Sequence, residues 1–389
     1  MRARRILFLN NQGLDQSGGG VTILRHLTER FARENQVTVL AESRLEEDPS
    51  GVEQRLLPPP PAPRGALWRF APLSKARSWR EEVPARAPEV DLAVVLDCHA
   101  SLAMPGLAAR RRLYLSLSAM GRMEWFLGGR SARLSRALQY GWLERRAIAV
   151  ADRCVVSSEL HAREIRRFGF LPGFRPSVVP PALPAPTAEG ATSAPLLETL
   201  SPGTALVLSV ARLEPLKGLD LVPRLARLLG DQDAVFAIVG AGPERARLEA
   251  LVHELGVQER VRIVGEVNDL LPWYRRADVF LHPSRYESFG MAVHEAMQHG
   301  VPPICGRPGP RCVVAYPEFL EDRREGRLVD LDDPGAVAAA LREWLESPAR
   351  RRAVGEAARA RATGQVAADY AGQIQRLAEA LFGGEEGAP

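Results

Sequence analysis

Cysteine is scarce in this chain and shows no metal-binding spacing. Four cysteines occur in 389 residues, and no two of them form a C-x-x-C pair. This usage argues against a structural zinc site and against a secreted scaffold held by disulfides. A reducing, cytoplasmic environment is therefore expected. The four positions are Cys98, Cys154, Cys305 and Cys312.

Long apolar runs are also missing. No stretch approaches the roughly 18 apolar residues that a membrane-spanning helix needs. The N-terminal sequence MRARRILFLN has a basic start, but the apolar run at residues 6–9 is too short for the core of a signal peptide. It predicts a first strand instead, and any membrane contact is expected to be peripheral, on the inner face of the membrane.

Net charge is small, but it is unevenly divided. The total is +4, whereas residues 1–180 contain 28 Lys and Arg against 18 Asp and Glu. An anionic partner would meet this half, although a solvated basic surface explains the excess equally well. The Arg-rich helical pattern at 121–146 begins with apolar residues, which suits either an anionic membrane surface or a core helix with a solvated face. No nucleic-acid-binding module accompanies the basic half, so nucleic acid is not an expected partner.

The chain does contain a regular alternation of short apolar runs with longer helical patterns. This alternation predicts βαβ units and parallel sheets. A chain of 389 residues usually has more than one core, and the Pro-, Ala- and Ser-rich stretch at 178–202 predicts a linker between two doubly wound α/β domains. Strands are expected at 6–9, 37–41, 92–96, 113–117 and 154–157, and then at 205–210, 234–239, 261–264, 279–281 and 303–305.

Glycines follow the first predicted strand. Gly18, Gly19 and Gly20 precede an amphipathic helical pattern, so the backbone could come close to a ligand and the helix N–H groups could face a diphosphate. Such a turn can also be a plain connector. The spacing does not match GxGxxG, so a dinucleotide cofactor is not favoured.

Two motifs follow strands of the second half. Arg212 and Lys217 come after the strand at 205–210, where an open α/β sheet binds ligands, and could neutralise a leaving diphosphate. A surface ion-pair pattern is the alternative. Gly240 and Gly242 follow the next strand, in a turn that suits close approach to a ligand or a tight βα connection.

The most specific motif runs from Ser284 to Ala296. Glu287 precedes a helical pattern, and Glu295 lies about two turns along it. A carboxylate can accept hydrogen bonds from two neighbouring hydroxyls, as in ribose, and amides at the helix start, from Phe289 and Gly290, can meet sugar hydroxyls or phosphate. A lone Glu on a helix can also be a solvated residue.

Taken together, these four motifs and their order resemble the retaining glycosyltransferase family 4, with the GT-B fold of two facing Rossmann-like domains and a cleft between them. The resemblance covers nearly the whole chain. It implies an acceptor-binding domain at 1–180, a nucleotide-sugar-binding domain at 181–362, and a C-terminal helix at about 363–385 that packs back on the first domain.

The resemblance also implies roles for individual residues. Glu295 would hold the ribose, while Arg212 and Lys217 would bind the diphosphate. Glu287 would bracket the transferred sugar. The complete set of expected donor-binding positions is Gly19, Gly20, Arg212, Lys217, Gly240, Gly242, Val267, Glu287, Ser288, Phe289, Gly290 and Glu295.

The implied reaction moves a hexose-type sugar from a nucleoside diphosphate sugar, with UDP the first choice and GDP the next. The acceptor would be a glycan, a lipid-linked glycan or a small metabolite. The family retains the anomeric configuration without a metal or other cofactor. The sequence agrees in that Asp330, Asp332 and Asp333 are best interpreted as a loop and helix cap.

Two departures from the family pattern leave alternatives open. Many members carry a catalytic histidine where this chain has Ser116 and Ser118, so His99 after the preceding strand could serve instead, or could be a polar loop residue. Cys312 stands where a glutamate is common. These departures allow a non-catalytic partner subunit, and a sugar-nucleotide epimerase is a further alternative within the fold.

Overall fold

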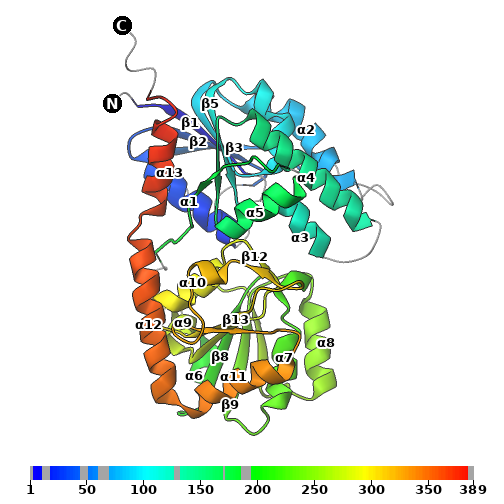
Figure 1. Ribbon diagram of the computed structural model, residues 1–389, viewed down its shortest axis with the longest axis vertical. Helices are drawn as coiled ribbons and strands as arrows, with labels where there is room; N and C mark the ends of the chain where they lie inside the picture. Colours follow the sequence, from blue (N-terminus) through cyan, green and yellow to red (C-terminus); the bar gives the residue numbers. More distant parts are fainter. Residues whose placement is uncertain are drawn as a thin grey trace. The chain divides into compact units, whose positions relative to one another are not determined.

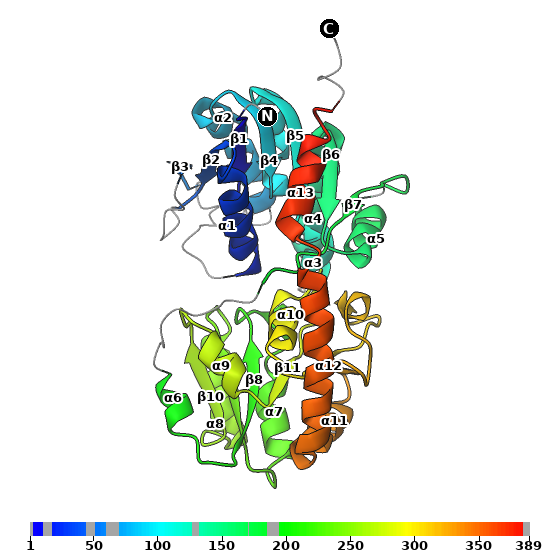
Figure 2. The ribbon, with the colours of Figure 1, turned by 90° about the vertical axis from the view of Figure 1, so that its left-hand side faces the viewer.

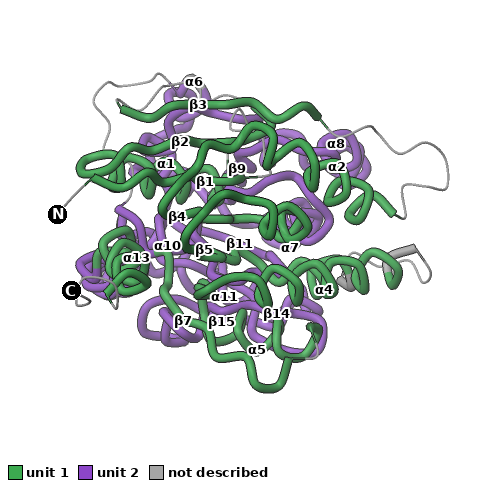
Figure 3. Tube along the Cα trace, turned by 90° about the horizontal axis from the view of Figure 1, so that it is seen from above, with its two compact units in different colours: residues 1–181, 369–389 green, residues 182–368 purple. Residues whose placement is uncertain are grey.

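The computed structural model describes residues 3–10, 18–43, 51–59, 70–126, 132–169, 171–184 and 194–383. The chain divides into two compact units, shown in two colours in Figure 3: unit 1 comprises residues 1–181 and 369–389, and unit 2 comprises residues 182–368. The division falls within a residue of the predicted boundary, but the chain returns to unit 1 later than the expected start of the C-terminal helix.

Unit 1 is built on a seven-stranded sheet in which every pairing is parallel. The order β3-β2-β1-β4-β5-β6-β7 places β1 beside β4 at the centre. Its inner strands are buried on both faces, which is why they appear in the sequence as continuous apolar runs. The strands are β1 (Arg5–Leu9), β2 (Gln36–Ala41), β3 (Val52–Leu56), β4 (Val90–Val95), β5 (Ala109–Ser116), β6 (Arg153–Val156) and β7 (Ser177–Val178).

Helices of unit 1 pack on this sheet. In α1, apolar residues at helical spacing, such as Val21, Leu24 and Phe31, are buried. The last helix, α13, lies beside α1 (Figure 1), and Arg30 donates a hydrogen bond to Gln375 at 3.0 Å. The helices are α1 (Gly19–Ala32), α2 (Ala71–Arg86), α3 (Met120–Phe126), α4 (Ala132–Val150), α5 (Glu159–Phe168) and α13 (Tyr370–Glu379).

Unit 2 has a six-stranded parallel sheet of order β10-β9-β8-β11-β13-β15. A two-stranded ladder, β12 with β14, stands apart from it. The strands are β8 (Ala205–Val210), β9 (Ala234–Val239), β10 (Val261–Gly265), β11 (Val279–His282), β12 (Tyr286–Glu287), β13 (Pro303–Gly306), β14 (Val313–Val314) and β15 (Arg327–Val329).

The helices of unit 2 cover its sheet, and the long α12 runs beside α10 (Figure 2). Buried aliphatic and aromatic side chains such as Phe236, Phe280 and Trp344 form one core between sheet and helices. The helices are α6 (Pro195–Glu198), α7 (Leu221–Leu228), α8 (Arg245–Leu255), α9 (Leu271–Arg276), α10 (Met291–Gln298), α11 (Pro334–Glu346) and α12 (Pro348–Val366).

All ten strands predicted from apolar runs are confirmed, and so are the two parallel sheets. Within the described ranges, every helix is too short or too polar to cross a lipid bilayer. The helical pattern predicted at 121–146 corresponds to α3 and α4, although 127–131 lie outside the described residues.

The prediction of one unbroken C-terminal helix is wrong. Helix α12 ends at Val366, and a second helix, α13, begins at Tyr370. Between them Asp369 has a φ of 51°, a left-handed conformation that interrupts a helix, and its carboxylate accepts the Gly372 N–H at 3.1 Å. The helical periodicity continues across this break, so the apolar pattern alone could not locate it.

Each sheet has a point at its centre where the chain reverses the direction in which strands are added. In unit 1 this point lies between β1 and β4, and in unit 2 it lies between β8 and β11. Open parallel sheets bind ligands at the carboxyl ends of the strands at such a point. In unit 2, Arg212 and Lys217 follow β8, and Glu287 follows β11.

Candidate functional site

The loops that follow β8 and β11 are fastened to each other in unit 2. The carbonyl of Leu216 accepts the Arg285 N–H at 2.9 Å and the Ser284 hydroxyl at 3.4 Å. Gly218 has a φ of +60°, and a Cβ at this position would lie 2.4 Å from the Pro283 carbonyl oxygen. Only glycine allows this approach, which sets Lys217 beside the segment that carries Glu287.

Lys217 and Glu287 form the centre of the site. The Lys217 Nζ lies 2.5 Å from Oε1 of Glu287, and Nε2 of His282 lies 3.0 Å from the same oxygen. The Glu287 carbonyl also accepts the Ala315 N–H at 3.1 Å, so the backbone of Glu287 is held by β14. Two donors therefore converge on one carboxylate oxygen.

The ionisation of Glu287 follows from these contacts. Burial alone would raise the pKa of this carboxyl, but the Lys217 ammonium and the His282 hydrogen bond outweigh burial and hold the pKa well below its ordinary value. Glu287 is thus a carboxylate at any physiological pH, able to accept hydrogen bonds from a ligand's hydroxyls.

Arg212 lies on the loop after β8 but does not join the Lys217–Glu287 pair. Its Nη1 lies 2.9 Å from Glu214 Oε1, and its side chain is half exposed. The predicted glycines support this loop: a Cβ on Gly240 would lie 2.0 Å from the Ala211 carbonyl oxygen, and one on Gly242 would lie 2.5 Å from that of Leu213. Both glycines thus allow the β9–α8 turn to pack against the backbone around Arg212.

The segment between β12 and α10 contains Ser288, Phe289 and Gly290. The Phe289 ring is buried against Phe319, with the ring centroids 4.9 Å apart, so the side chain belongs to the core. Neither the Phe289 nor the Gly290 N–H donates a hydrogen bond to another described residue. These two N–H groups at the start of α10 are suited to an anion or a hydroxyl oxygen.

Glu295 lies on α10 and is held by a residue of another helix. The Tyr274 hydroxyl donates a hydrogen bond to its Oε2 at 3.0 Å, and the Tyr274 ring stacks on His299 with the centroids 5.2 Å apart. Burial raises the pKa of Glu295 to about 7, and the Tyr274 hydrogen bond offsets part of this rise. Glu295 is therefore poised between its acid and its carboxylate near neutral pH.

Three further positions of unit 2 that the sequence analysis singled out are Val267, Cys312 and Asp333. Val267 follows β10 and is partly buried against the core. Cys312, at the departure from the family pattern, is buried and its thiol donates to the Ser284 carbonyl at 3.8 Å. Asp333 accepts the Ala336 N–H at 3.0 Å and caps α11, so the interpretation of this acidic stretch as a helix cap is confirmed.

In unit 1, Gly19 and Gly20 form the first turn of α1. The N–H groups of Val21 and Thr22 donate to the Gly18 carbonyl, whereas those of Gly19 and Gly20 donate to no other described residue. The helix start thus offers backbone donors, as the glycine motif predicted. The expected contact of these N–H groups with a diphosphate stays a prediction.

His99 follows β4, immediately after the central strand pair of unit 1. It is buried, and its Nδ1 lies 2.5 Å from Asp97 Oδ1, while its ring meets the edge of Tyr140 at a centroid distance of 5.3 Å. His99 is therefore an oriented imidazole rather than a loose polar loop residue. Whether it acts in catalysis stays a prediction.

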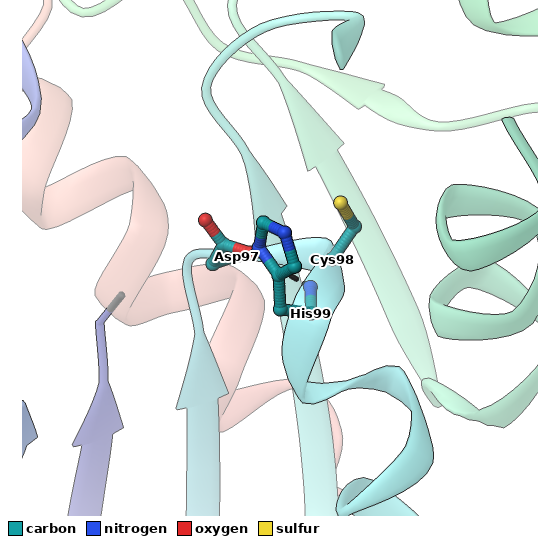
Figure 4. Close-up of side chains that lie close together, drawn as sticks. All are labelled: Asp97, Cys98 and His99. Atoms are coloured by element: carbon teal, nitrogen blue, oxygen red, sulfur yellow. Dashed lines mark hydrogen bonds and ion pairs between the residues drawn. The ribbon is translucent and has the colours of Figure 1, made fainter. Parts of the chain in front are cut away.

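Asp97, Cys98 and His99 bring one potential metal-ligand atom each to within 4.8 Å of one another. In Figure 4 the His99 ring lies between the Asp97 carboxylate and the Cys98 sulfur. Burial raises the pKa of the Cys98 thiol well above its ordinary value, and the Asp97 carboxylate lies against Nδ1 of His99. The trio thus consists of an oriented histidine beside a buried thiol.

The serines that stand in place of the family histidine are engaged in unit 1. Ser116 Oγ lies 3.2 Å from Nε2 of His161, and Ser157 Oγ lies 2.9 Å from Nδ1 of the same ring. Burial lowers the pKa of His161 to about 3, so the ring is neutral. Ser118 Oγ lies 3.2 Å from the Met120 sulfur. Ser116 is thus committed to a buried hydrogen-bond cluster.

Both halves of the chain match protein-family models. Residues 17–184 match the family model described as Glycosyltransferase Family 4, and residues 198–361 match the model described as Glycosyl transferases group 1. Between them the two models cover most of the chain. The chain belongs to glycosyltransferase family 4. The family consists of transferase enzymes, as the names of similar proteins also state.

Similar proteins agree with this membership. A D-inositol 3-phosphate glycosyltransferase 2 of Catenulispora acidiphila is 33% identical over 230 residues, which are 55% of this chain and 52% of that protein. The chain spans about half the length of the curated relatives it matches.

Solved structures share the GT-B fold over nearly the whole chain. Sucrose-phosphate synthase of Thermosynechococcus elongatus has a TM-score of 0.79 at 22% identity, covering 98% of this chain and 100% of that one. Anabaena HepE in complex with UDP and glucose has a TM-score of 0.71 at 19% identity, covering 97% of this chain and 99% of that one. At these identities the likeness establishes the fold alone.

Two contacts of this family 4 site were not predicted. His282 is the last residue of β11, and Tyr274 lies on α9, 21 positions before Glu295. A histidine at the end of a strand, shortly before a carboxylate that was predicted to bind a ligand, was a usable signal, because open parallel sheets bind ligands at the carboxyl ends of their strands. Nothing in the sequence indicated Tyr274, because its contact depends on how α9 packs against α10.

Proposed function

We propose that this chain transfers a hexose from a nucleoside diphosphate sugar, with UDP as the first candidate nucleotide. The transfer retains the anomeric configuration and needs no metal ion. One observation carries the proposal: at the centre of the unit 2 sheet, Lys217 and the ionised Glu287 lie 2.5 Å apart, next to a helix start with available N–H groups. A diphosphate needs positive charge, and a sugar needs hydroxyl acceptors. This arrangement offers both.

For each part of the sugar nucleotide, the described residues include side chains that could bind it. Lys217 and the half-exposed Arg212 would neutralise the diphosphate, whose negative charge grows as the sugar leaves. Glu295 would accept both ribose hydroxyls as a carboxylate, and Glu287 would accept hydroxyls of the sugar. Backbone N–H groups of Phe289 and Gly290 would complete the contacts at the start of α10.

Metal independence is supported by what these cations can do. In many transferases a divalent cation neutralises the leaving diphosphate, and here Lys217 and Arg212 are available for that task. The acidic residues that formally resemble a metal motif have other partners: Asp332 lies 2.8 Å from Arg285, and Asp333 caps α11.

UDP is the first candidate nucleotide for two reasons. The resemblance to family 4 implies it, and the similar HepE structure is a complex with UDP and glucose. For the acceptor, the name of the Catenulispora relative suggests an inositol phosphate as one compound to test. Retention of configuration follows from the family resemblance.

The test is an assay of UDP release from UDP-glucose in the presence of EDTA, with and without candidate acceptors that include D-inositol 3-phosphate. The proposal expects release that persists in EDTA and that is abolished in Glu287→Ala. Analysis of the product by NMR would show an α-linkage. Release that depends on added Mg²⁺, or a β-linked product, would contradict the corresponding part of the proposal.

We also propose that unit 1 contacts an anionic membrane surface through the outer face of α4. Leu134, Leu138 and Trp142 follow one another at intervals of four on this face and are 44%, 58% and 46% exposed. They are followed by exposed Arg145 and Arg146. An apolar stripe with adjacent arginines is the pattern of a helix that lies in a membrane interface.

Charge on α4 supports this contact. The acidic residue of the helix, Glu144, is fully buried and is therefore absent from the outer face. The Arg146 guanidinium lies over the Trp142 ring at 5.8 Å, which joins the basic and apolar parts of the face. The test is flotation of the full chain with vesicles that contain phosphatidylglycerol; protein that stays at the bottom at low salt would end the idea.

A further inference from the structure

His282 is a buried histidine whose ring makes a single hydrogen bond within the described part of the chain. Its side chain is 3% exposed, stacked on Phe280 at a centroid distance of 5.8 Å and met edge-on by Tyr316 at 6.2 Å. Nε2 lies 3.0 Å from Glu287 Oε1, while Nδ1 has no hydrogen-bond partner among the described residues. Burying an unsatisfied ring nitrogen is unfavourable, so packing alone does not account for a histidine here.

At Glu287 the two donors leave the carboxylate asymmetric. Lys217 and His282 both point to Oε1, and Oε2 receives no hydrogen bond from any described residue. The side chain keeps 14% of its exposure. The carboxylate is thus fixed through one oxygen and has the other available to a ligand.

The two hydrogen-bond donors, Lys217 and His282, differ in how firmly they can hold Glu287 once a sugar nucleotide binds. Lys217 carries its charge on a flexible four-carbon stem, and a diphosphate would compete with Glu287 for it. The His282 ring is fixed between Phe280 and Tyr316 and cannot follow. If Lys217 turned toward a phosphate, His282 would therefore be the hydrogen-bond donor that still holds Oε1 of Glu287.

We propose that His282 is a positioning residue for sugar recognition: its Nε2–H holds Oε1 of Glu287 so that Oε2 accepts a hydroxyl of the transferred sugar. This inference rests on the proposed function. In this inference, His282 helps the chain to bind a sugar nucleotide more tightly than the bare nucleoside diphosphate. The reason is that Glu287 would contact the sugar, whereas other residues would contact the nucleotide.

The experiment is isothermal titration calorimetry of the full chain with two probes, UDP and UDP-glucose. In His282→Leu, which fills the volume but donates nothing, we expect the Kd for UDP-glucose to rise about tenfold while the Kd for UDP changes less than about twofold. In His282→Gln, whose amide can donate from a similar position, we expect most of the UDP-glucose affinity to return.

Two controls separate positioning from a general structural role. His294→Leu also removes a buried imidazole from unit 2, one bonded to Gln365 at 3.1 Å, and should leave the ratio of the two Kd values unchanged. In a Glu287→Ala background, His282→Leu should add no further loss of UDP-glucose affinity, because its effect acts through Glu287.

Equal weakening of both probes by His282→Leu, no change in either, or an additive loss in the Glu287→Ala background would overturn the inference. A wild-type chain that binds UDP and UDP-glucose with equal strength would overturn it too. A wild-type chain that binds neither probe would instead overturn the proposed function itself, and the inference with it.

Discussion

The Lys217 ammonium and the Glu287 carboxylate lie 2.5 Å apart, although 70 positions separate them in the chain. The parallel sheet of unit 2 makes this pairing possible, because it sets the carboxyl ends of β8 and β11 side by side. A second pair, Lys75 with Glu42, is 2.7 Å apart and similarly buried, but it belongs to unit 1. It serves as a control.

Replacing Lys217 by Ala should lower kcat/KM for the sugar donor by about 10²- to 10³-fold, because the leaving diphosphate loses a cation. Stability should fall as well, since Glu287 is left as a nearly buried charge with one partner fewer. Steady-state kinetics and urea unfolding measure the two effects. Lys75→Ala should lower stability without affecting kcat/KM, and a comparable kinetic loss in both variants would contradict the assignment.

The raised pKa of Glu295 predicts a pH-dependent stability. Burial raises this pKa to about 7 in the folded chain from its ordinary value of 4.5, so the folded state favours the acid form. The stabilisation is complete below the unfolded pKa and is lost as the pH rises through 7. Glu295→Gln should therefore be more stable than wild type by roughly 2–3 kcal/mol at pH 8 and nearly equal to it at pH 4.5. An equal difference at both pH values, measured by urea unfolding, would refute this.

Binding should show the opposite trend, because the ribose hydroxyls need the carboxylate form of Glu295. UDP-glucose affinity should rise as the pH increases from 6 to 8, with a midpoint near 7. UDP-glucose is the suitable probe because its diphosphate is esterified at both ends and lacks the second ionisation of a terminal phosphate. Calorimetry of Glu295→Gln should show weak binding with no such midpoint, and a midpoint that persists in this variant would remove Glu295 as its source.

A methyl group on Gly240 should disturb the loop of Arg212. The added Cβ would lie 2.0 Å from the Ala211 carbonyl oxygen, at a φ of +140°. We expect Gly240→Ala to weaken UDP binding at least about tenfold and to lower stability by about 2 kcal/mol or more. The control is Gly256→Ala, where the φ is +67° but nothing lies within 4 Å of the added Cβ. Its cost should be the backbone strain of about 1 kcal/mol alone, with UDP affinity kept.

The proposed membrane contact through the outer face of α4 predicts that a negative charge added to this face abolishes membrane binding. Leu138→Glu places a carboxylate in the middle of the apolar stripe and should abolish flotation with anionic vesicles. Leu228, on α7 of unit 2, is 53% exposed against 58% for Leu138, so Leu228→Glu is the matched control and should float like wild type. Flotation of the Leu138→Glu variant would exclude this face as the contact.

Much of the fold was predictable because parallel strands buried on both faces appear as uninterrupted apolar runs. Strand β3 shows where this signal fails: its sequence VEQRL contains two apolar residues, and it lies at the edge of the sheet with mostly half-exposed side chains. Such a strand is held by its backbone pairing with β2, which leaves no apolar pattern in the sequence.

In the candidate site, one pairing was predictable from the order of the strands: Lys217 follows β8, Glu287 follows β11, and these two strands lie side by side. The ligand-binding roles of Glu287, Glu295, Lys217 and Arg212 stay predictions. Contacts between elements were not predictable. The Tyr274 hydroxyl reaches Glu295 only because α9 packs against α10, and Gly240 supports Arg212 only because two loops meet.

The central claim is that unit 2 holds a nucleoside diphosphate without a metal ion. The most direct measurement is a thermal-shift titration of the purified chain with UDP, GDP, ADP and CMP, with Mg²⁺ and with EDTA, because a ligand that binds only the folded state raises the unfolding midpoint. We predict a rise with UDP that is equal in Mg²⁺ and EDTA and absent in Glu295→Ala. No shift with any of the four nucleotides, or a shift that requires Mg²⁺, would contradict the claim.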